Sequence, residues 1–478
     1  GRIYSPVWYK LKEEWSNLMN NLKSKFNIEN LMCLFVIICP ILDMSSFIFR
    51  NAFNINFSPS TFIRPLIPAS IMIYLFLKND KKFKIKAIVV VGLYLIYSVI
   101  HIYLFSKKKT LSSNSNEIHE IQYLVNYSFM ILNLFLYVYI FKDKNVDKLR
   151  KSVLISVIIY VTSIFISIIT NTSSYTYPED QIGLKGWFES GNSICSILIL
   201  AMFIYMPLMK KHRIITGIVL LISSLFLTTV VGTRVGLFGV IIVLSIYIAT
   251  ETLQGIIKYK KINKKIMVFG IISIVAIISV VALFGSATIQ RRQHLQNMEQ
   301  SIFDNTLNSQ AHLTGDLLEI KEKIEDNTLE EGYMSEAQKQ SIIDLYNLAN
   351  RWNVKNNDQR MQQLIYNVSL VKNQADPTLI LFGNGYNTNF RELVFEMEVL
   401  AILFNFGVIG FLLYLMPFLG IMIYSLYKVI VKYKKFDSEY TRLFLGLGFA
   451  FALSFFSGYT FFNQSSALMI VLISTLLI

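Results

Sequence analysis

The sequence predicts an all-α polytopic membrane protein, with about twelve transmembrane helices and one large helical domain outside the membrane. Of its 478 residues, 54% are hydrophobic and only 16% are charged, whereas soluble proteins carry about 25% charged residues. Apolar runs of about 20 residues, the length that crosses a bilayer as a helix, recur along the chain. This composition excludes an ordinary soluble enzyme.

The predicted transmembrane helices are the apolar runs of the chain. Residues 214–250 carry a single charge, Arg234, and we interpret them as two helices joined by a tight turn at residues 231–234. The twelve runs lie at residues 31–49, 62–77, 87–106, 121–141, 152–170, 192–209, 214–231, 235–250, 266–285, 402–427, 443–461 and 464–478.

Lysine and arginine residues predict which loops face the cytoplasm. They gather in segments 1–30, 78–86, 142–151, 210–213, 251–265 and 428–442, which alternate in the order that twelve helices require. Both termini are therefore expected in the cytoplasm. The net charge of +14 mainly reflects this topology, so it does not indicate a nucleic acid partner.

Four regions follow from this pattern. Residues 1–30 are expected to form a cytoplasmic amphipathic segment, because Trp8, Leu11, Trp15, Leu18 and Leu22 follow helical spacing. No cleavable signal peptide is expected there, since the first apolar run begins at Leu31. Residues 31–285 hold helices one to nine, residues 286–392 an extracytoplasmic helical cap domain, and residues 393–478 helices ten to twelve.

The sequence contains none of the common cofactor motifs. Its three cysteines lie in apolar runs without a C-x-x-C pair, and its five histidines show no metal-ligand spacing. There is no H-E-x-x-H, no D-x-D and no P-loop. We therefore expect a metal-independent reaction without a cofactor, and no nucleotide-driven transport.

Charged groups near the bilayer are candidates for function, because burying them is costly. Arg234 lies at the predicted outer turn of an apolar hairpin, where its guanidinium fork suits a pyrophosphate group. It could equally be an interfacial anchor that reaches toward lipid headgroups. Arg50 and Arg64 also fall on the predicted outer side.

Glu396 and Glu398 open the apolar run after the cap domain. A carboxylate at the membrane edge is a candidate general base, although both could simply be the acidic residues that favour a helix N-terminus. In a helix, residues two apart point about 200° apart, so at most one of them faces a given site. Arg291 and Arg360 belong to the cap domain, where ion pairs with its carboxylates are the alternative to catalysis.

Four segments resemble the bacterial O-antigen ligase and Wzy-type polysaccharide polymerase family of integral-membrane glycosyltransferases. Residues 186–192, ending in Asn192, are similar to its G-x-F-x-x-x-N segment, and Thr233-Arg234 with Gly236 is similar to its [ST]-R-x-G turn. Arg360, followed by Pro377 and residues 381–386, resembles an Arg before a P…LFGxG loop. Residues 396–410 resemble the segment that ends in G-[IV]-[IV]-G.

The resemblance implies a GT-C-like enzyme that joins oligosaccharide repeat units carried on undecaprenyl pyrophosphate, as in O-antigen or capsule polymerisation, by inverting transfer. Where many members carry a proposed His base, this sequence has Glu396, and Asn405 stands where many have Glu. The implied pyrophosphate ligands are Arg234 and Arg360, with Arg291 or Arg64. Further candidate site residues are Glu398, Asn192, Gly383 and Gly385.

The implied location is the outer face of the bacterial plasma membrane. The expected partners are the lipid-linked donor and acceptor, membrane lipids, and flippase and chain-length regulator proteins. Two alternatives stay open: a ligase that transfers the glycan to another acceptor, and a lipid-oligosaccharide flippase or other transporter.

Overall fold

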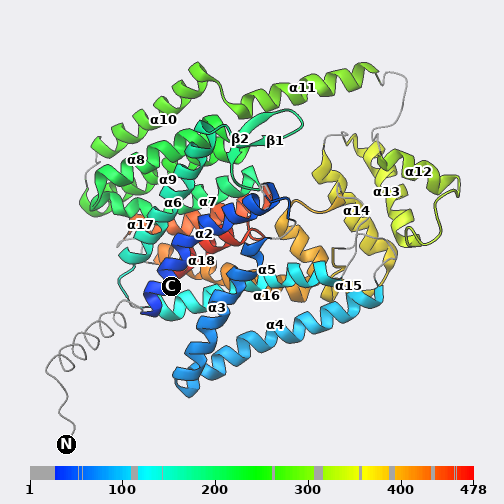
Figure 1. Cartoon of the computed structure of the whole chain (residues 1–478), viewed down its shortest axis with the longest axis horizontal. Coiled ribbons are helices and arrows are strands. Elements are labelled where there is room, and N and C mark those ends of the chain that lie inside the picture. Colours follow the sequence, from blue (N-terminus) through cyan, green and yellow to red (C-terminus); the bar gives the residue numbers. More distant parts are fainter. Residues whose placement is uncertain are drawn as a thin grey trace, which may run out of the picture.

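The structure is a computed structural model in which long helices pack side by side into a bundle (Figure 1). It describes residues 27–51, 53–55, 58–108, 117–142, 144–260, 264–305, 316–354, 358–386, 393–431, 436–456, 458 and 460–478. The amphipathic helix predicted before residue 27 lies outside these residues.

The helices of the bundle follow the predicted apolar runs. They are α2 (Ile28–Asn51), α3 (Pro59–Lys78), α4 (Lys81–Lys108), α5 (Glu117–Phe141), α6 (Asp147–Ile169), α7 (Gly191–Tyr205) with the 3-10 helix η1 (Met206–Lys210), α8 (Arg213–Leu225) with the π-helix η2 (Phe226–Val230), α9 (Arg234–Tyr259), α10 (Lys264–Phe284), α16 (Glu398–Val431), α17 (Ser438–Phe456) and α18 (Gln464–Leu477).

Within the described ranges, nine helices are long and apolar enough to cross a membrane. A tenth is added if α10 and α11 (Ala287–Asn305), which meet at a bend of 47°, form one broken span. Helices α17 and α18 occupy the last two predicted runs, but α18 has only 14 residues, fewer than the roughly 20 that span a bilayer. The chain is thus a multi-pass membrane protein, and a count of twelve crossings stays a prediction.

Helix α7 lies at the centre of the bundle. It carries no charged residue, and its side chains from Ser193 to Tyr205 are buried against α6, α9, α17 and α18. Glycines bring its neighbours close: a Cβ on Gly239 would lie 2.4 Å from Ile199, and one on Gly446 would lie 2.8 Å from Phe203. Small residues at such contacts allow helices to approach closely in a membrane.

Most segments predicted to face the cytoplasm meet at one end of the bundle. They are joined there by ion pairs between Glu29 and Lys144, Asp147 and Lys211, Arg150 and Glu439, and Glu251 and Arg442. The structure therefore groups these loops as the charge pattern predicts. That this end faces the cytoplasm stays a prediction.

A short β-hairpin accompanies the helices, and the all-α prediction holds for the fold as a whole because the described chain is mainly helical. Strands β1 (Ser174–Tyr177) and β2 (Ile182–Gly186) pair in antiparallel register, with Tyr177 opposite Ile182. Aromatic and β-branched residues beside a Pro178-Glu179-Asp180 turn favour this fold, but such short strands give only a weak sequence pattern. Gly183 has φ +69°, and a Cβ there would lie 2.5 Å from the Val231 carbonyl oxygen. The absence of a side chain therefore allows the hairpin to pack against the turn before α9.

The polar stretch 286–392 is mainly helical where it is described, and its role as an extracytoplasmic cap domain stays a prediction. It holds α11, α12 (Asp316–Glu325), α13 (Glu336–Trp352), α14 (Gln359–Gln374) and α15 (Pro377–Phe382), while residues 306–315, 355–357 and 387–392 lie outside the described ranges. Helices α12–α14 form a group at the right of Figure 1. Their shared core includes Ile342, Leu345, Tyr366 and Leu370.

Helix α16 breaks at Gly407, and a loop packs on the break. Gly407 has φ 68° and ψ −176°, outside the helical region. The backbone N–H groups of Asn384 and Gly385 donate to the carbonyls of Phe404 and Asn405 at 3.0 and 2.8 Å. These bonds satisfy carbonyls beside the break. The loop after α15 is thereby fixed to the short first part of α16, which begins two residues after Glu396.

We expect Gly407→Ala to destabilise the folded protein. A Cβ at this position would lie 2.4 Å from the Gly383 nitrogen, and its backbone conformation costs a non-glycine residue about 1–3 kcal/mol. The thermal unfolding midpoint of the purified protein in detergent should therefore fall. Gly420→Ala on the same helix is the matched control, because nothing lies within 4 Å of its Cβ. Equal midpoints for the two variants would contradict this account.

Candidate active site

A polar cavity of about 560 Å³ opens at the end of the bundle away from the basic loops. Its walls come from the second half of α2, the first turns of α3, α5 and α7, the β-hairpin and the residues just before α18. Its volume lies in the range of about 300–1,000 Å³ typical of small-molecule sites.

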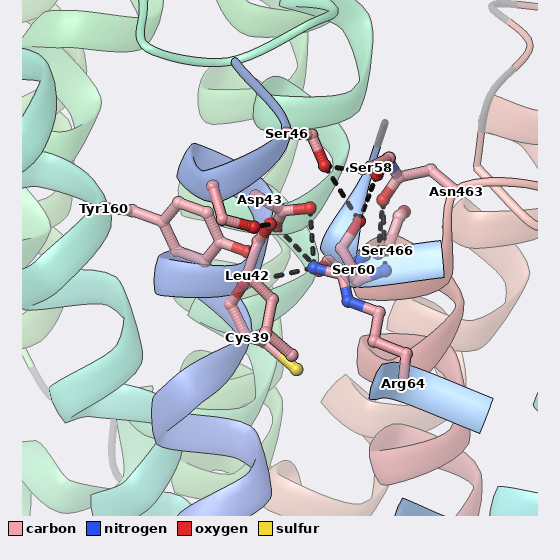
Figure 2. Close-up of polar contacts among 12 residues, drawn as sticks. Cys39, Leu42, Asp43, Ser46, Ser58, Ser60, Arg64, Tyr160, Asn463 and Ser466 are labelled. Carbon is pink, nitrogen blue, oxygen red and sulfur yellow. Dashed lines mark hydrogen bonds and ion pairs between the residues drawn. The ribbon is translucent and has the colours of Figure 1, made fainter. Parts of the chain in front are cut away.

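The inner wall of the cavity is a hydrogen-bonded network centred on Asp43 (Figure 2). Arg64 Nη2 donates to Asp43 Oδ1 at 2.6 Å and to the Cys39 carbonyl at 3.1 Å. Asp43 Oδ2 accepts hydrogen bonds from the Tyr160 hydroxyl at 2.5 Å and the Ser465 hydroxyl at 2.7 Å. The predicted site residue Arg64 therefore lines the cavity, but Asp43 already balances its charge.

The outer rim of the cavity carries a second set of paired charges. Arg50 Nη1 lies 3.2 Å from Glu189 Oε1, and Lys185 Nζ donates to the Glu189 carbonyl at 2.9 Å. Burial lowers the pKa of the Lys185 ammonium, and the Glu189 carboxylate opposes that shift. Asn192, a further predicted site residue, lies on the same wall at the start of α7.

Tyr177 of the hairpin lines this cavity and lies near a second group of charged residues. We call this group, Arg234, Arg291, Arg360 and Glu396, the charged cluster. Burial raises the pKa of its hydroxyl, while Arg291 and Arg234 act to lower it and Glu396 acts to raise it. The guanidinium carbon of Arg291 lies 4.6 Å from the centre of the Tyr177 ring. Three of the predicted site residues, distant in sequence, thus lie within electrostatic reach of one hydroxyl.

Glu396 is held between α14 and the start of α16. Its carboxylate Oε2 lies 3.4 Å from Arg360 Nε, and its backbone N–H donates to Gln363 Oε1 at 3.0 Å. The side chains of Glu396 and Arg360 are 41% and 42% exposed, so both remain accessible to a ligand. The structure therefore brings the predicted base into contact with a predicted pyrophosphate ligand.

The arginines of the cluster differ in how far their charge is balanced. Arg291 forms an ion pair with Asp180, which also lies 2.7 Å from His294 Nε2. Arg234 is exposed and makes no ion pair within the described part of the chain. It is the first residue of α9, which Thr233 caps by accepting from the Gly236 N–H, so the helix dipole adds positive potential there. Arg234 is thus the most available anion-binding group in the cluster.

Glu398 is part of the scaffold rather than the accessible surface. It is 4% exposed, and its carboxylate accepts hydrogen bonds from the backbone N–H groups of Thr460, Phe461 and Phe462 at 2.7–2.8 Å. The backbone just before α18 is thereby tied to the first turn of α16. Both of its oxygens are occupied, which favours a structural role.

Two further residues hold the loop that carries Gly383 and Gly385: His101, inside the predicted span 87–106, and Glu120, one residue before the span 121–141. His101 Nδ1 donates to the Phe382 carbonyl at 2.7 Å, and His101 Nε2 lies 2.7 Å from Glu120 Oε1. A Cβ on Gly383 would lie 2.1 Å from the Asn405 carbonyl, and one on Gly385 would lie 2.3 Å from the Phe105 ring. Both glycines therefore make close contacts within the protein itself.

The site residues predicted from the sequence do not include Asp43, His101, Glu120 or Tyr177. Asp43 is the one charged residue in the predicted span 31–49, and His101 lies within the span 87–106. The cost of burying such groups in a membrane, which pointed to Arg234, would have identified these two as well. Tyr177 gave no comparable signal, because its role depends on the hairpin.

Among the described residues, no three His, Cys, Asp or Glu side chains are grouped to hold a metal ion. A reaction without a metal or cofactor stays a prediction.

Comparison with known families gives one match. The family model described as "O-antigen ligase like membrane protein" matches residues 25–478, nearly the whole chain. The comparisons with curated proteins and with solved structures gave no match. The extent of the family match agrees with the resemblance noted in four segments of the sequence, and the chain belongs to the O-antigen ligase like family of membrane proteins.

Proposed function

We propose that the protein is a glycosyltransferase that joins lipid-linked oligosaccharide units at the outer face of the bacterial plasma membrane, as a polysaccharide polymerase. Membership of the family indicates a membrane protein that processes glycans. One observation above all supports the finer proposal: Arg291 lies over the Tyr177 ring, Arg234 and Glu396 act electrostatically on the hydroxyl of the same tyrosine, and Arg360 contacts Glu396.

In the proposed reaction, an acceptor sugar hydroxyl attacks the anomeric carbon of a glycan carried on undecaprenyl pyrophosphate. The new bond forms between the acceptor oxygen and the anomeric carbon as the bond from that carbon to the pyrophosphate oxygen breaks, with inversion. The Glu396 carboxylate takes the proton of the hydroxyl, as a general base. Arg360, 3.4 Å from that carboxylate, orients it.

The leaving group determines which other residues the reaction needs. Polyprenyl pyrophosphate departs as a stable anion, so it requires positive charge and no proton donor. Arg234 offers an accessible guanidinium at a helix N-terminus, and Arg291 and Arg360 lie in the same cluster. One carboxylate and several arginines therefore suffice for the chemistry.

Two other functions fit the same family. A ligase would use the same donor and move its glycan to a different acceptor, such as another lipid, a wall polymer or a protein. A flippase or other transporter would move the lipid-linked glycan without cleaving it. These differ from a polymerase in their products.

The direct test uses purified protein in detergent with undecaprenyl-pyrophosphate-linked repeat units. A polymerase yields longer lipid-linked chains, detectable by mass spectrometry, although no membrane is present. Transfer only after a second acceptor is added would indicate a ligase. Unchanged substrate under both conditions would contradict a transferase.

Glu396→Gln should reduce chain elongation by about 10²–10⁴-fold, the usual contribution of a general base. The amide keeps the size of the side chain but cannot take up the proton. Elongation is measured as product formed per minute, with Glu331→Gln, an exposed carboxylate between α12 and α13, as the control. Full activity of Glu396→Gln would remove this residue from the mechanism.

Arg234→Lys should reduce elongation by about 10- to 100-fold. Lysine retains the charge but loses the fork that binds two phosphate oxygens together, and a charge-assisted hydrogen bond contributes about 1.5–3 kcal/mol. The rate of elongation at donor concentrations well below saturation, which reports kcat/KM, checks this. Arg292→Lys, an exposed arginine on α11, serves as the matched control. Equal rates for the two variants would be incompatible with pyrophosphate binding by Arg234.

A further inference from the structure

We infer that the polar cavity beside Tyr177 is a carbohydrate-binding subsite, separate from the charged cluster that takes the pyrophosphate. This inference rests on the proposed function and assigns the sugar and phosphate parts of the substrate to different places. Three features of the cavity carry it: its two arginines are already paired with carboxylates, its uncharged polar groups resemble those of sugars, and its position adjoins the cluster.

The arginines of the cavity are already balanced by carboxylates, so an anionic ligand would gain little by binding there. Arg64 is paired with Asp43 at 2.6 Å, and Arg50 is paired with Glu189 at 3.2 Å. Lys185 is partly buried and donates to a backbone carbonyl. A pyrophosphate bound here would have to compete with two carboxylates, whereas Arg234 has no ion-pair partner within the described residues.

The other polar groups of the cavity match sugar hydroxyls. The hydroxyls of Ser46, Ser58 and Ser60 form a triangle with oxygen–oxygen distances of 2.5, 2.9 and 2.9 Å (Figure 2). Asn126 and Gln464 also line the cavity, and Asn126 Oδ1 accepts from Gln464 Nε2 at 2.9 Å. Hydroxyl and amide groups both donate and accept hydrogen bonds, as sugar hydroxyls do.

The cavity also combines apolar surface with a rigid inner wall. Tyr177, Phe188 and Phe462 line it, and aromatic rings can cover the C–H face of a pyranose. Asp43 connects α2 to α3 through Arg64, to α6 through Tyr160 and to α18 through Ser465. A site held from four helices is preorganised, which lowers the entropic cost of binding a ligand with many hydroxyls.

The position of the cavity suits a substrate with a sugar and a phosphate part. Tyr177 lines the cavity, the Arg291 guanidinium carbon lies 4.6 Å from its ring centre, and Arg234 and Glu396 act electrostatically on its hydroxyl. A sugar in the cavity would therefore lie next to a pyrophosphate at the arginines. The cavity would then decide which sugar is accepted, while the cluster would take any polyprenyl pyrophosphate.

The test measures binding of two probes to the purified full-length protein in detergent. One probe is undecaprenyl pyrophosphate without sugar; the other is the repeat-unit oligosaccharide released by mild acid from the lipid-linked pool of the producing cells. Ser58→Ala and Asn192→Ala should each weaken oligosaccharide binding about tenfold, the effect of one lost hydrogen bond. Both should leave undecaprenyl pyrophosphate binding within about twofold of the unaltered protein.

Two controls make the result specific. Asn350→Ala, an exposed residue of α13, should change neither affinity. Arg234→Ala should show the opposite selectivity, with weaker undecaprenyl pyrophosphate binding and unchanged oligosaccharide binding. The thermal midpoint of each variant shows whether it is folded, and Ser58→Ala provides a second measurement if Asn192→Ala is unstable.

Three outcomes would overturn the subsite. They are loss of undecaprenyl pyrophosphate binding in the cavity variants, unchanged oligosaccharide binding in both of them, and no oligosaccharide binding by the unaltered protein. Because these measurements do not depend on turnover, failure of the subsite is distinguishable from failure of the proposed transferase, which would appear as unchanged lipid-linked substrate.

Discussion

The ion pair between Asp43 and Arg64 is the contact on which the arrangement of the site depends. Both residues belong to helices that run through the membrane region, where an unpaired charge is costly. Removing one partner of a buried pair typically costs about 3–5 kcal/mol, because the other charge remains buried without compensation. The pair therefore fixes α2 against α3, and through Tyr160 and Ser465 it also fixes α6 and α18.

A second set of contacts fixes Glu396 relative to this wall. The break at Gly407 exposes backbone carbonyls of α16, and the loop after α15 binds them. Glu398 ties the start of α16 to the backbone just before α18, whose residues Phe462–Gln464 line the cavity. The same short segment thus connects the predicted base to the cavity. Neither connection requires a group of the substrate, so both exist before it binds.

The sequence predicted the helices well because a membrane imposes one simple rule. A run of about 20 apolar residues has few alternatives to a spanning helix, so the ranges agree for α2 to α9. The break at Gly407 and the hairpin at Ser174–Gly186 are not determined by this rule. Each depends on backbone contacts with residues far away in the chain, such as Gly383 and Val231. Local patterns carry little of that information.

The site was predictable to the extent that its residues are charged. Arg64, Arg234, Arg291, Arg360 and Glu396 stand out from an apolar sequence, and most of them cluster in the structure. Their partners decide what each one can do, and partners appear only in three dimensions. Asp43 balances Arg64, whereas no carboxylate in the described residues is paired with Arg234.

Two kinds of arginine that look alike in the sequence thus differ in whether a carboxylate already balances their charge. An arginine that already holds a buried carboxylate gains little from an incoming phosphate, because it must first give up an equivalent bond. An exposed arginine at a helix N-terminus gives up only water. In a site at the membrane edge, the arginine expected to bind an anion is therefore the one that has no ion-pair partner in the protein. By that criterion, we propose the turn before α9 as the place of anion binding, and the paired charges around Asp43 belong to the framework that shapes the cavity.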